Sequence, residues 1–109
     1  MSRTVDELTV RWEEDGVLKV KELDKAVLSS GAWATVAFLC QELDVATGQY
    51  KAPKVSLRRY RKRGDAYVVD KHLTLSSGAQ ATSLARALLG WFEDGGLGAH
   101  AGGALDEEG

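Results

Sequence analysis

The order of hydrophobic and polar residues predicts a series of β-strands followed by one helix. Apolar and polar residues alternate in residues 8–12 and again in residues 17–23, which is the period of a half-buried strand. Between these segments lies an acidic turn, residues 13–16, in which Gly16 can adopt a positive φ. The pattern therefore predicts an N-terminal hairpin over residues 8–23. Residues 25–28 fit either the end of its second strand or a short turn of helix.

The most hydrophobic run of the chain, residues 33–43, predicts a central strand covered on both faces. It is nearly continuously apolar and rich in β-branched and aromatic residues. A turn over residues 44–50 follows it. Pro53 then stands at the entrance of the next strand, where its missing N–H removes no ladder hydrogen bond. We expect this strand to turn at Gly64-Asp65 and to return as residues 66–75.

From residue 77 onward the hydrophobic period becomes that of a helix. Ser77 and Gln80 fit a capping box, and apolar residues at 81, 84, 85, 88, 91 and 92 recur at helical spacing. We expect a helix over residues 80–92 that ends at Gly95-Gly96. Its apolar face is broad enough to pack on the sheet and also to form a dimer interface. The residues expected at that interface are Leu84, Leu88, Trp91 and Phe92.

These elements predict an α+β fold, with an antiparallel sheet of four or more strands and one C-terminal helix. A chain of 109 residues has the length of one domain, which we expect to span residues 1–94. Residues 95–109 are rich in glycine, end in acidic residues and are expected to be disordered. No apolar run approaches the roughly 18 residues of a membrane span, and the first residues lack the apolar core of a signal peptide. We therefore expect a cytoplasmic protein.

The charge of the chain is divided into blocks of opposite sign. Residues 51–72 contain eight Lys or Arg and two Asp or Glu, a net charge of +6. Residues 1–50 contain five against nine, and residues 73–109 one against five, so that each carries −4. Such asymmetry indicates either a polyanionic partner or contact between oppositely charged subunits. The basic residues are concentrated in one strand, as Lys54, Arg58, Arg59, Arg61, Lys62 and Arg63.

The two faces of this basic strand differ in chemistry. Alternation places Lys54, Ser56, Arg58, Tyr60 and Lys62 on one face and Val55, Leu57 and Arg59 on the other. The second face can join a core. The first combines cations with an aromatic ring, a mixture that binds single-stranded nucleic acid, although Tyr60 equally fits a sheet-packing position.

Two further sets of residues have a structural interpretation. Arg59, Arg61 and Arg63 can pair with the acidic turn around residues 13–15, in the same or a partner subunit, which would make the basic strand architectural. The three tryptophans are expected in the core or at a dimer interface. They are Trp12, Trp33 and Trp91.

The sequence does not have the residue spacings that are typical of a catalytic or metal site. The two histidines, His72 and His100, do not have metal-ligand spacing, and no phosphate-binding glycine loop opens a helix. The only cysteine, Cys40, lies in an apolar run and is expected to be a buried, unreactive thiol. We therefore expect a binding protein with no enzymatic activity, cofactor or metal.

Two short segments resemble a known family. Lys-Val-Ser-Leu-Arg-Arg-Tyr at residues 54–60 and Lys-His-Leu-Thr-Leu-Ser-Ser-Gly-Ala-Gln at residues 71–80 resemble the positive-cofactor-four transcriptional coactivators and their bacterial and phage relatives. Those proteins have an aromatic-ended basic strand, then a Lys-x-Ile-Ser-Leu-type segment with a Gln in the first helical turn. The resemblance covers roughly residues 33–92. It implies a curved four-stranded antiparallel sheet and a helix, dimerisation through the helices, and single-stranded DNA held across the exposed sheet. The plant Whirly proteins have a related plan.

The resemblance also implies which residues bind. Lys54, Arg58, Tyr60 and Lys62 would face the nucleic acid and Lys71 would lie near the passage from strand to helix, with Trp33 and Thr35 as further candidates. With the neighbouring cations, the expected contact residues are Lys54, Arg58, Arg59, Tyr60, Arg61, Lys62, Arg63 and Lys71. The chain departs from the family pattern in the hairpin 8–23, in Ala81 where relatives often have Trp, and in lacking a Gly-Lys-rich loop before the last strand.

Two functions are consistent with the sequence. The first is a small homodimeric protein that binds single-stranded DNA or RNA without sequence preference and acts in transcription regulation, replication or repair, associated with the nucleoid if its ligand is DNA. In that case, replacing Arg58, Tyr60 and Lys62 together should abolish binding without unfolding the protein. The second is a homo-oligomeric interaction module that binds no nucleic acid, in which acidic and basic segments meet across subunits and high salt loosens the assembly.

Overall fold

The computed structural model describes residues 4–93, which belong to two compact units, Met1–Gly78 and Ala79–Gly109. The first unit contains a 3₁₀ helix, η1 (Val5–Glu7), and six strands. The strands are β1 (Trp12–Glu14), β2 (Val17–Ser29), β3 (Trp33–Asp44), β4 (Gln49–Tyr50), β5 (Lys54–Arg63) and β6 (Ala66–Leu75). One helix, α1 (Gly78–Phe92), follows them. The predicted α+β fold, an antiparallel sheet followed by a C-terminal helix, is therefore confirmed.

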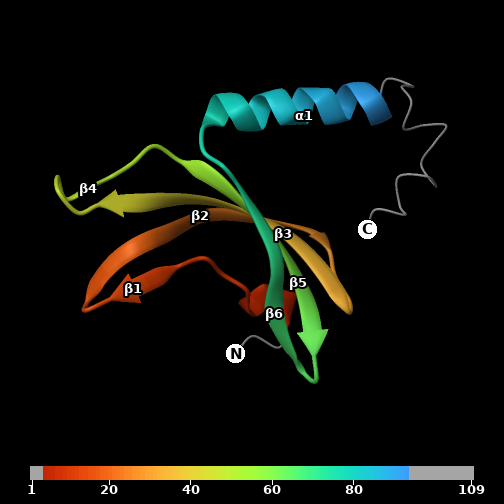
Figure 1. Ribbon diagram of the computed structural model, residues 1–109, viewed down its shortest axis with the longest axis horizontal. Coiled ribbons are helices and arrows are strands. Elements are labelled where there is room, and N and C mark those ends of the chain that lie inside the picture. Colours follow the sequence, from red (N-terminus) through yellow and green to blue (C-terminus); the bar gives the residue numbers. More distant parts are fainter. Residues whose placement is uncertain (1–3, 94–109) are drawn as a thin grey trace. The chain divides into compact units, whose positions relative to one another are not determined.

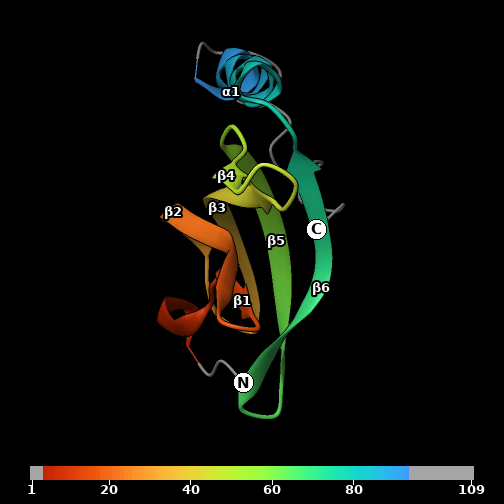
Figure 2. The same cartoon turned by 90° about the vertical axis from the view of Figure 1, so that its left-hand side faces the viewer.

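The strands form one antiparallel sheet in the order β1-β2-β3-β5-β6, with the short β4 paired to β3. Neighbours in the sheet are mostly neighbours in the chain, because tight turns join them. The long strands β2, β3, β5 and β6 curl strongly, as Figures 1 and 2 show. The curl gives the sheet a concave face, and that face holds the core.

The turns of the sheet have the backbone that their residues predict. Asp15 and Gly16, with φ of 53° and 78°, join β1 to β2. Two consecutive positive φ angles are typical of the type I′ turn, whose twist matches that of a hairpin. Gly64, with φ of 63°, lies in the two-residue turn between Arg63 and Ala66. The turn predicted at Gly64-Asp65 is confirmed, whereas the one predicted over residues 13–16 is limited to Asp15 and Gly16.

The first strand is displaced from its predicted position. The sequence predicts a strand over residues 8–12 and a turn over residues 13–16, whereas β1 is Trp12–Glu14. Leu8 and Val10 lie outside the ladder and are buried, 4% and 7% exposed. The segment that contains them does not pair with a neighbouring strand, because its side chains pack against the face of the sheet. Lys25 holds this N-terminal segment, donating from Nζ to the carbonyls of Val5 (2.6 Å) and Leu8 (2.9 Å).

The core lies on the opposite face of the basic strand from the one predicted to join it. Ser56 and Tyr60 of β5 are 6% and 3% exposed, whereas Val55, Leu57 and Arg59 are only half-buried. The N-terminal segment covers the Ser56–Tyr60 face, and this decides which side is buried. The core cluster consists of Leu8, Val10, Ala34, Val36, Phe38, Cys40, Tyr60 and Tyr67.

Burial alternates along β3. The prediction that the strand is covered on both faces is therefore wrong for the unit Met1–Gly78. Val36 and Phe38 are fully buried, whereas Leu39 is 37% exposed. The three tryptophans are not core residues either: Trp12, Trp33 and Trp91 are 53%, 47% and 52% exposed. Cys40, at 2% exposed, is the buried free thiol that the sequence predicts.

Helix α1 begins directly after Ser77, where the capping box predicts a helix start, and ends at Phe92. None of its residues is buried. The predicted stop at Gly95-Gly96 and the predicted disordered tail lie outside the described residues, and the extent of the domain stays a prediction. Within residues 4–93, no helix combines the length and the apolar character needed to cross a membrane.

Candidate nucleic-acid interface

The curled sheet divides the predicted contact residues between its two faces. Strand register places Lys54, Arg58 and Tyr60 beside Cys40, Val36 and Ala34, on the concave face. Arg59 and Arg61 pair with Thr35 and Trp33 and belong to the convex face, and Lys71 is the partner of Arg59 in β6. Lys62 and Arg63 are exposed at the tip of the hairpin. The eight residues therefore do not form one surface.

Tyr60 is a packing residue in this structure. Its ring meets that of Tyr67 edge to face, with centroids 6.4 Å apart and planes at 71°. Burial raises the pKa of Tyr60, while a hydrogen bond with Arg58 opposes that shift. At 3% exposed the ring offers no face to a base, so the expected stacking role of Tyr60 is wrong for this conformation, and the sheet-packing interpretation is correct.

The exposed aromatic ring of the convex face is Trp33, at the start of β3. The guanidinium carbon of Arg59 lies 4.9 Å from the centroid of the Trp33 ring, and that of Arg61 lies 5.9 Å from it. Both distances are within the range of cation–π interactions. Two cationic side chains thus lie near the ring, while almost half of the residue stays exposed.

A β-bulge fixes the orientation of Arg59. Arg59 pairs with Lys71 and Tyr60 with Val69, so Asp70 is an extra residue in β6. Asp70 Oδ2 accepts from Nε (3.1 Å) and Nη2 (2.9 Å) of Arg59. The guanidinium therefore has one edge on a carboxylate while it lies near the Trp33 ring. Asp70 is a residue of this site that no periodic pattern in the sequence reveals.

Beside this cluster, the convex face has a shallow hollow of about 390 Å³. Thr35, Leu57 and Leu73 contribute to its lining, together with Arg59 and Lys71. Leu73 is 54% exposed, so apolar surface is open to solvent next to cations. We call the group Trp33, Thr35, Leu57, Arg59, Arg61, Lys71 and Leu73 the Trp33 surface.

The cations of the concave face have different partners. Lys54 bonds Glu42 at 2.5 Å, and this bond is the main reason why the pKa of Glu42 is lowered. Lys62 lies over the Tyr67 ring, 5.0 Å from its centroid. The predicted pairing of the basic strand with the acidic turn is not seen for Arg59, which bonds Asp70, or for Glu13, which bonds Arg11 at 3.4 Å.

Other chemistry has little support among residues 4–93. No group of three or more His, Cys, Asp and Glu side chains is placed there to hold a metal ion. Burial raises the pKa of the Cys40 thiol, which keeps it protonated at neutral pH.

Comparisons with protein-family models, with curated proteins and with solved structures find no match for this chain.

Proposed function

We propose that this protein is a homodimeric, sequence-nonspecific single-stranded nucleic-acid-binding protein, and that the Trp33 surface is its contact surface. The observation that carries the proposal is the half-exposed Trp33 ring with the guanidinium groups of Arg59 and Arg61 at 4.9 and 5.9 Å. A base stacked on an exposed aromatic ring contributes about 1–3 kcal/mol whatever its identity. Cations around that ring neutralise the adjoining phosphates.

The remaining residues of the Trp33 surface fit the same ligand. Leu57 and Leu73 offer apolar surface to the faces of unstacked bases, while Lys71 and Arg61 are exposed and free to meet phosphates. A convex sheet face contacts unstacked bases by their faces and does not read base edges in a groove, so binding should be independent of sequence. Of the positions that the resemblance to the coactivators implies, Trp33, Thr35 and Lys71 belong to the Trp33 surface, whereas Lys54, Arg58 and Tyr60 lie on the other face of the sheet. The proposal therefore rests on the geometry of the Trp33 surface.

The proposed dimer forms through α1. Leu88, Trp91 and Phe92 are 42%, 52% and 45% exposed in the single chain, a large apolar area for a helix of this length. Arg86 is the one charged residue of α1. A second copy of the helix can therefore pack on this face in a two-fold contact without bringing like charges together. A dimer would carry two Trp33 surfaces. We propose that this arrangement serves transcription regulation, replication or repair.

Fluorescence anisotropy of a labelled single-stranded oligonucleotide tests the proposal. The oligonucleotide is titrated with protein at a low and a high salt concentration, and unlabelled duplex of the same sequence is added as competitor. We expect saturable binding that weakens steeply with salt, because neutralised phosphates release counterions. The duplex should displace the strand poorly, since its bases are not free to stack on Trp33. Absence of binding at low salt would refute the proposal and favour the interaction module without nucleic acid.

A further inference from the structure

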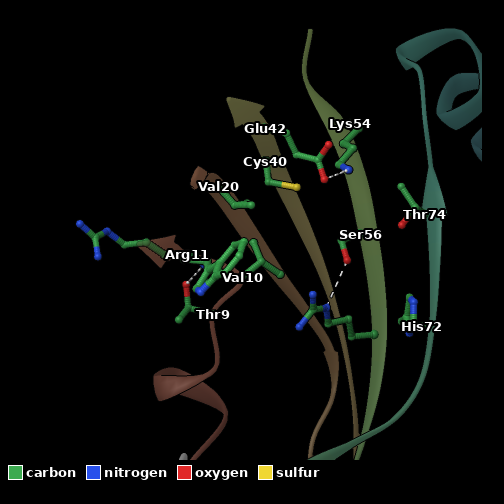
Figure 3. A pocket seen from close by; sticks show the side chains of 12 residues that line it. Thr9, Val10, Arg11, Val20, Cys40, Glu42, Lys54, Ser56, His72 and Thr74 are labelled. Atoms are coloured by element: carbon green, nitrogen blue, oxygen red, sulfur yellow. Dashed lines mark hydrogen bonds and ion pairs between the residues drawn. The ribbon is translucent and has the colours of Figure 1, made fainter. Parts of the chain in front are cut away.

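The concave face of the sheet contains a second hollow, a trough of about 410 Å³ that the proposed function does not use. Figure 3 shows it between the N-terminal segment and β6, with the side chains of β3 and β5 between them. The trough opens on the other face of the sheet from the Trp33 ring, and Arg58 and His72 border both this trough and the hollow of the convex face. Three cations and one carboxylate, Arg11, Lys54, Arg58 and Glu42, are among the residues that line it.

Strand register groups the polar side chains of the trough. Ser56 pairs with Thr74, and two residues along the same strands Arg58 pairs with His72. Two hydroxyl groups, a guanidinium and an imidazole therefore occupy four adjoining positions on one face of β5 and β6. Such a set donates hydrogen bonds from several directions, which is what a phosphate group with three acceptor oxygens requires.

Arg58 is the residue that distinguishes the trough. Its side chain is half-buried, and its Nε donates to the Ser56 hydroxyl at 3.3 Å. Its neighbours Lys54 and Arg11 each bond a carboxylate, whereas no ion pair of Arg58 is seen within residues 4–93. Burial raises the pKa values of Tyr60 and Cys40, so neither group supplies a negative charge at neutral pH. Arg58 also hydrogen-bonds Tyr60, and the Glu22 carboxylate, which accepts from Thr9, lies beside Cys40 on the same face. A partly buried guanidinium that has hydroxyl partners and no ion pair of its own is stabilised by an anion.

The opposite wall of the trough combines the polar residues Thr9 and Arg11 with an apolar and aromatic surface. Val10 and Val20 line it together with Trp12, which is 53% exposed and pairs with Val20 in the sheet. A free inorganic anion gains nothing from contact with an apolar and aromatic surface, whereas a nucleobase packs on one. We propose that the trough is a separate site for a phosphomonoester carried on a nucleobase, with the phosphate at Ser56, Arg58, His72 and Thr74 and the base along Trp12.

This chemistry has two sources, a free nucleoside 5′-monophosphate and the 5′-phosphorylated end of a single strand. Isothermal titration of the full chain with AMP, adenosine and inorganic phosphate tests the site itself. We expect AMP to bind at least about tenfold more tightly than either fragment, because only AMP uses both walls of the trough. No saturable binding of AMP, or AMP binding no tighter than inorganic phosphate, would overturn the proposal.

Two variants and a matched control place the ligand in the trough. Arg58→Gln should weaken AMP binding about tenfold or more, as expected for loss of a charge-assisted bond to phosphate. Thr74→Val should weaken it severalfold, and because Thr74 is exposed this variant keeps the test valid if Arg58→Gln fails to fold. Arg86→Gln removes the same charge from α1 and should leave AMP affinity unchanged. Equal weakening by Arg58→Gln and Arg86→Gln would contradict the proposal.

Oligonucleotides with a 5′-phosphate or a 5′-hydroxyl identify the source. Tighter binding of the phosphorylated strand that Arg58→Gln abolishes would assign strand ends to the trough. Equal binding of the two oligonucleotides, with AMP still bound through Arg58, would assign the trough to free nucleotides. The AMP titration does not depend on the single-strand proposal, so either proposal can fail without the other.

Discussion

Arg59 is held beside the Trp33 ring by a carboxylate that a bulge inserts into the neighbouring strand. Both Arg59 and Asp70 are partly buried, with side chains 28% and 22% exposed. The ion pair thus orients Arg59 but also sets a negative charge within the surface proposed to meet phosphates. These two effects of Asp70 on nucleic-acid binding oppose each other. Salt screens the repulsion between the Asp70 charge and phosphates, so the salt dependence of the affinity distinguishes this repulsion from the orientation of Arg59.

Asp70→Asn should raise the affinity for a single-stranded oligonucleotide by about two- to fivefold at low salt, the effect of removing one partly exposed charge. The asparagine oxygen can still accept from Arg59. The gain should shrink at high salt, where screening is strong. Anisotropy titrations of the wild type and the variant at both salt concentrations measure it. A loss of affinity at low salt would mean that orientation of Arg59 outweighs the charge.

Glu42 makes stability depend on pH in the acidic range. Its hydrogen bond with Lys54 lowers its pKa below the ordinary value of 4.5. The pair therefore stabilises the fold fully above the ordinary pKa, and this contribution is lost as the pH falls through the lowered value. Because the pair is partly exposed, it contributes less than about 1 kcal/mol.

Glu42→Gln should lower the free energy of unfolding at neutral pH by that small amount, and the difference from the wild type should vanish in strong acid. Urea denaturation of both proteins across a pH series checks this expectation. A difference that stays constant with pH would show that Glu42 acts through packing rather than through its charge.

At the scale of elements, the β5–β6 turn sets the register that brings Arg59, Lys71 and Asp70 together. Gly64 has a φ of 63°, and a Cβ placed there would meet nothing within 4 Å. The constraint is therefore in the backbone alone. An L-residue other than Gly costs about 1–2 kcal/mol in this left-handed conformation, and Asn tolerates it better than Ala.

Gly64→Ala should therefore destabilise the fold by about 1–2 kcal/mol, and Gly64→Asn should cost clearly less. Chemical denaturation of both variants separates backbone strain from the mere addition of a side chain. Equal stability of the Ala and Asn variants would argue against a left-handed residue at this turn.

Helix α1 carries the proposed dimer contact on one side. Leu88 belongs to the apolar face, and Ser83 lies on the opposite side of the helix by its spacing. In a two-fold contact a charge on the apolar face meets its own copy, so Leu88→Glu is doubly unfavourable.

Leu88→Glu should convert the dimer to monomer at concentrations where the wild type is dimeric, whereas Ser83→Glu adds the same charge and should leave the dimer intact. Sedimentation velocity of the three proteins gives the result. A monomeric wild type, or a Leu88→Glu variant that remains dimeric, would refute the contact through this face.

At the scale of the whole molecule, local patterns in the sequence predict the elements but not the way in which they enclose a core. The alternation in residues 54–63, the glycine turn at 64 and the capping residue Ser77 are local features, and the structure has a strand, a turn and a helix start there. Which face of the sheet is buried depends on Leu8 and Val10, which pack on strands more than 20 residues away in the chain. Periodicity within β5 carries no information about that contact.

The candidate site shows the same division. The concentration of cations in residues 54–63 is visible in the sequence, and so is the presence of Trp33 in a neighbouring strand. The separation of Arg58 from Arg59 onto opposite faces also follows from alternation. The bulge that adds Asp70 does not, because it is a shift in pairing between β5 and β6. Tyr60, an aromatic residue among cations, is a core residue because the distant N-terminal segment covers its face of the sheet.

Binding of a single strand on the Trp33 surface depends on the Trp33 ring, and the Trp33→Ala variant removes that ring. We predict that Trp33→Ala loses about 1–3 kcal/mol of affinity for a single-stranded oligonucleotide with a 5′-hydroxyl, which is about 5- to 150-fold in Kd. Leu28→Ala truncates another exposed apolar side chain, 62% exposed, and should bind as the wild type does. Circular dichroism confirms that both variants are folded. A folded Trp33→Ala variant with wild-type affinity would show that the single strand does not bind on the Trp33 surface.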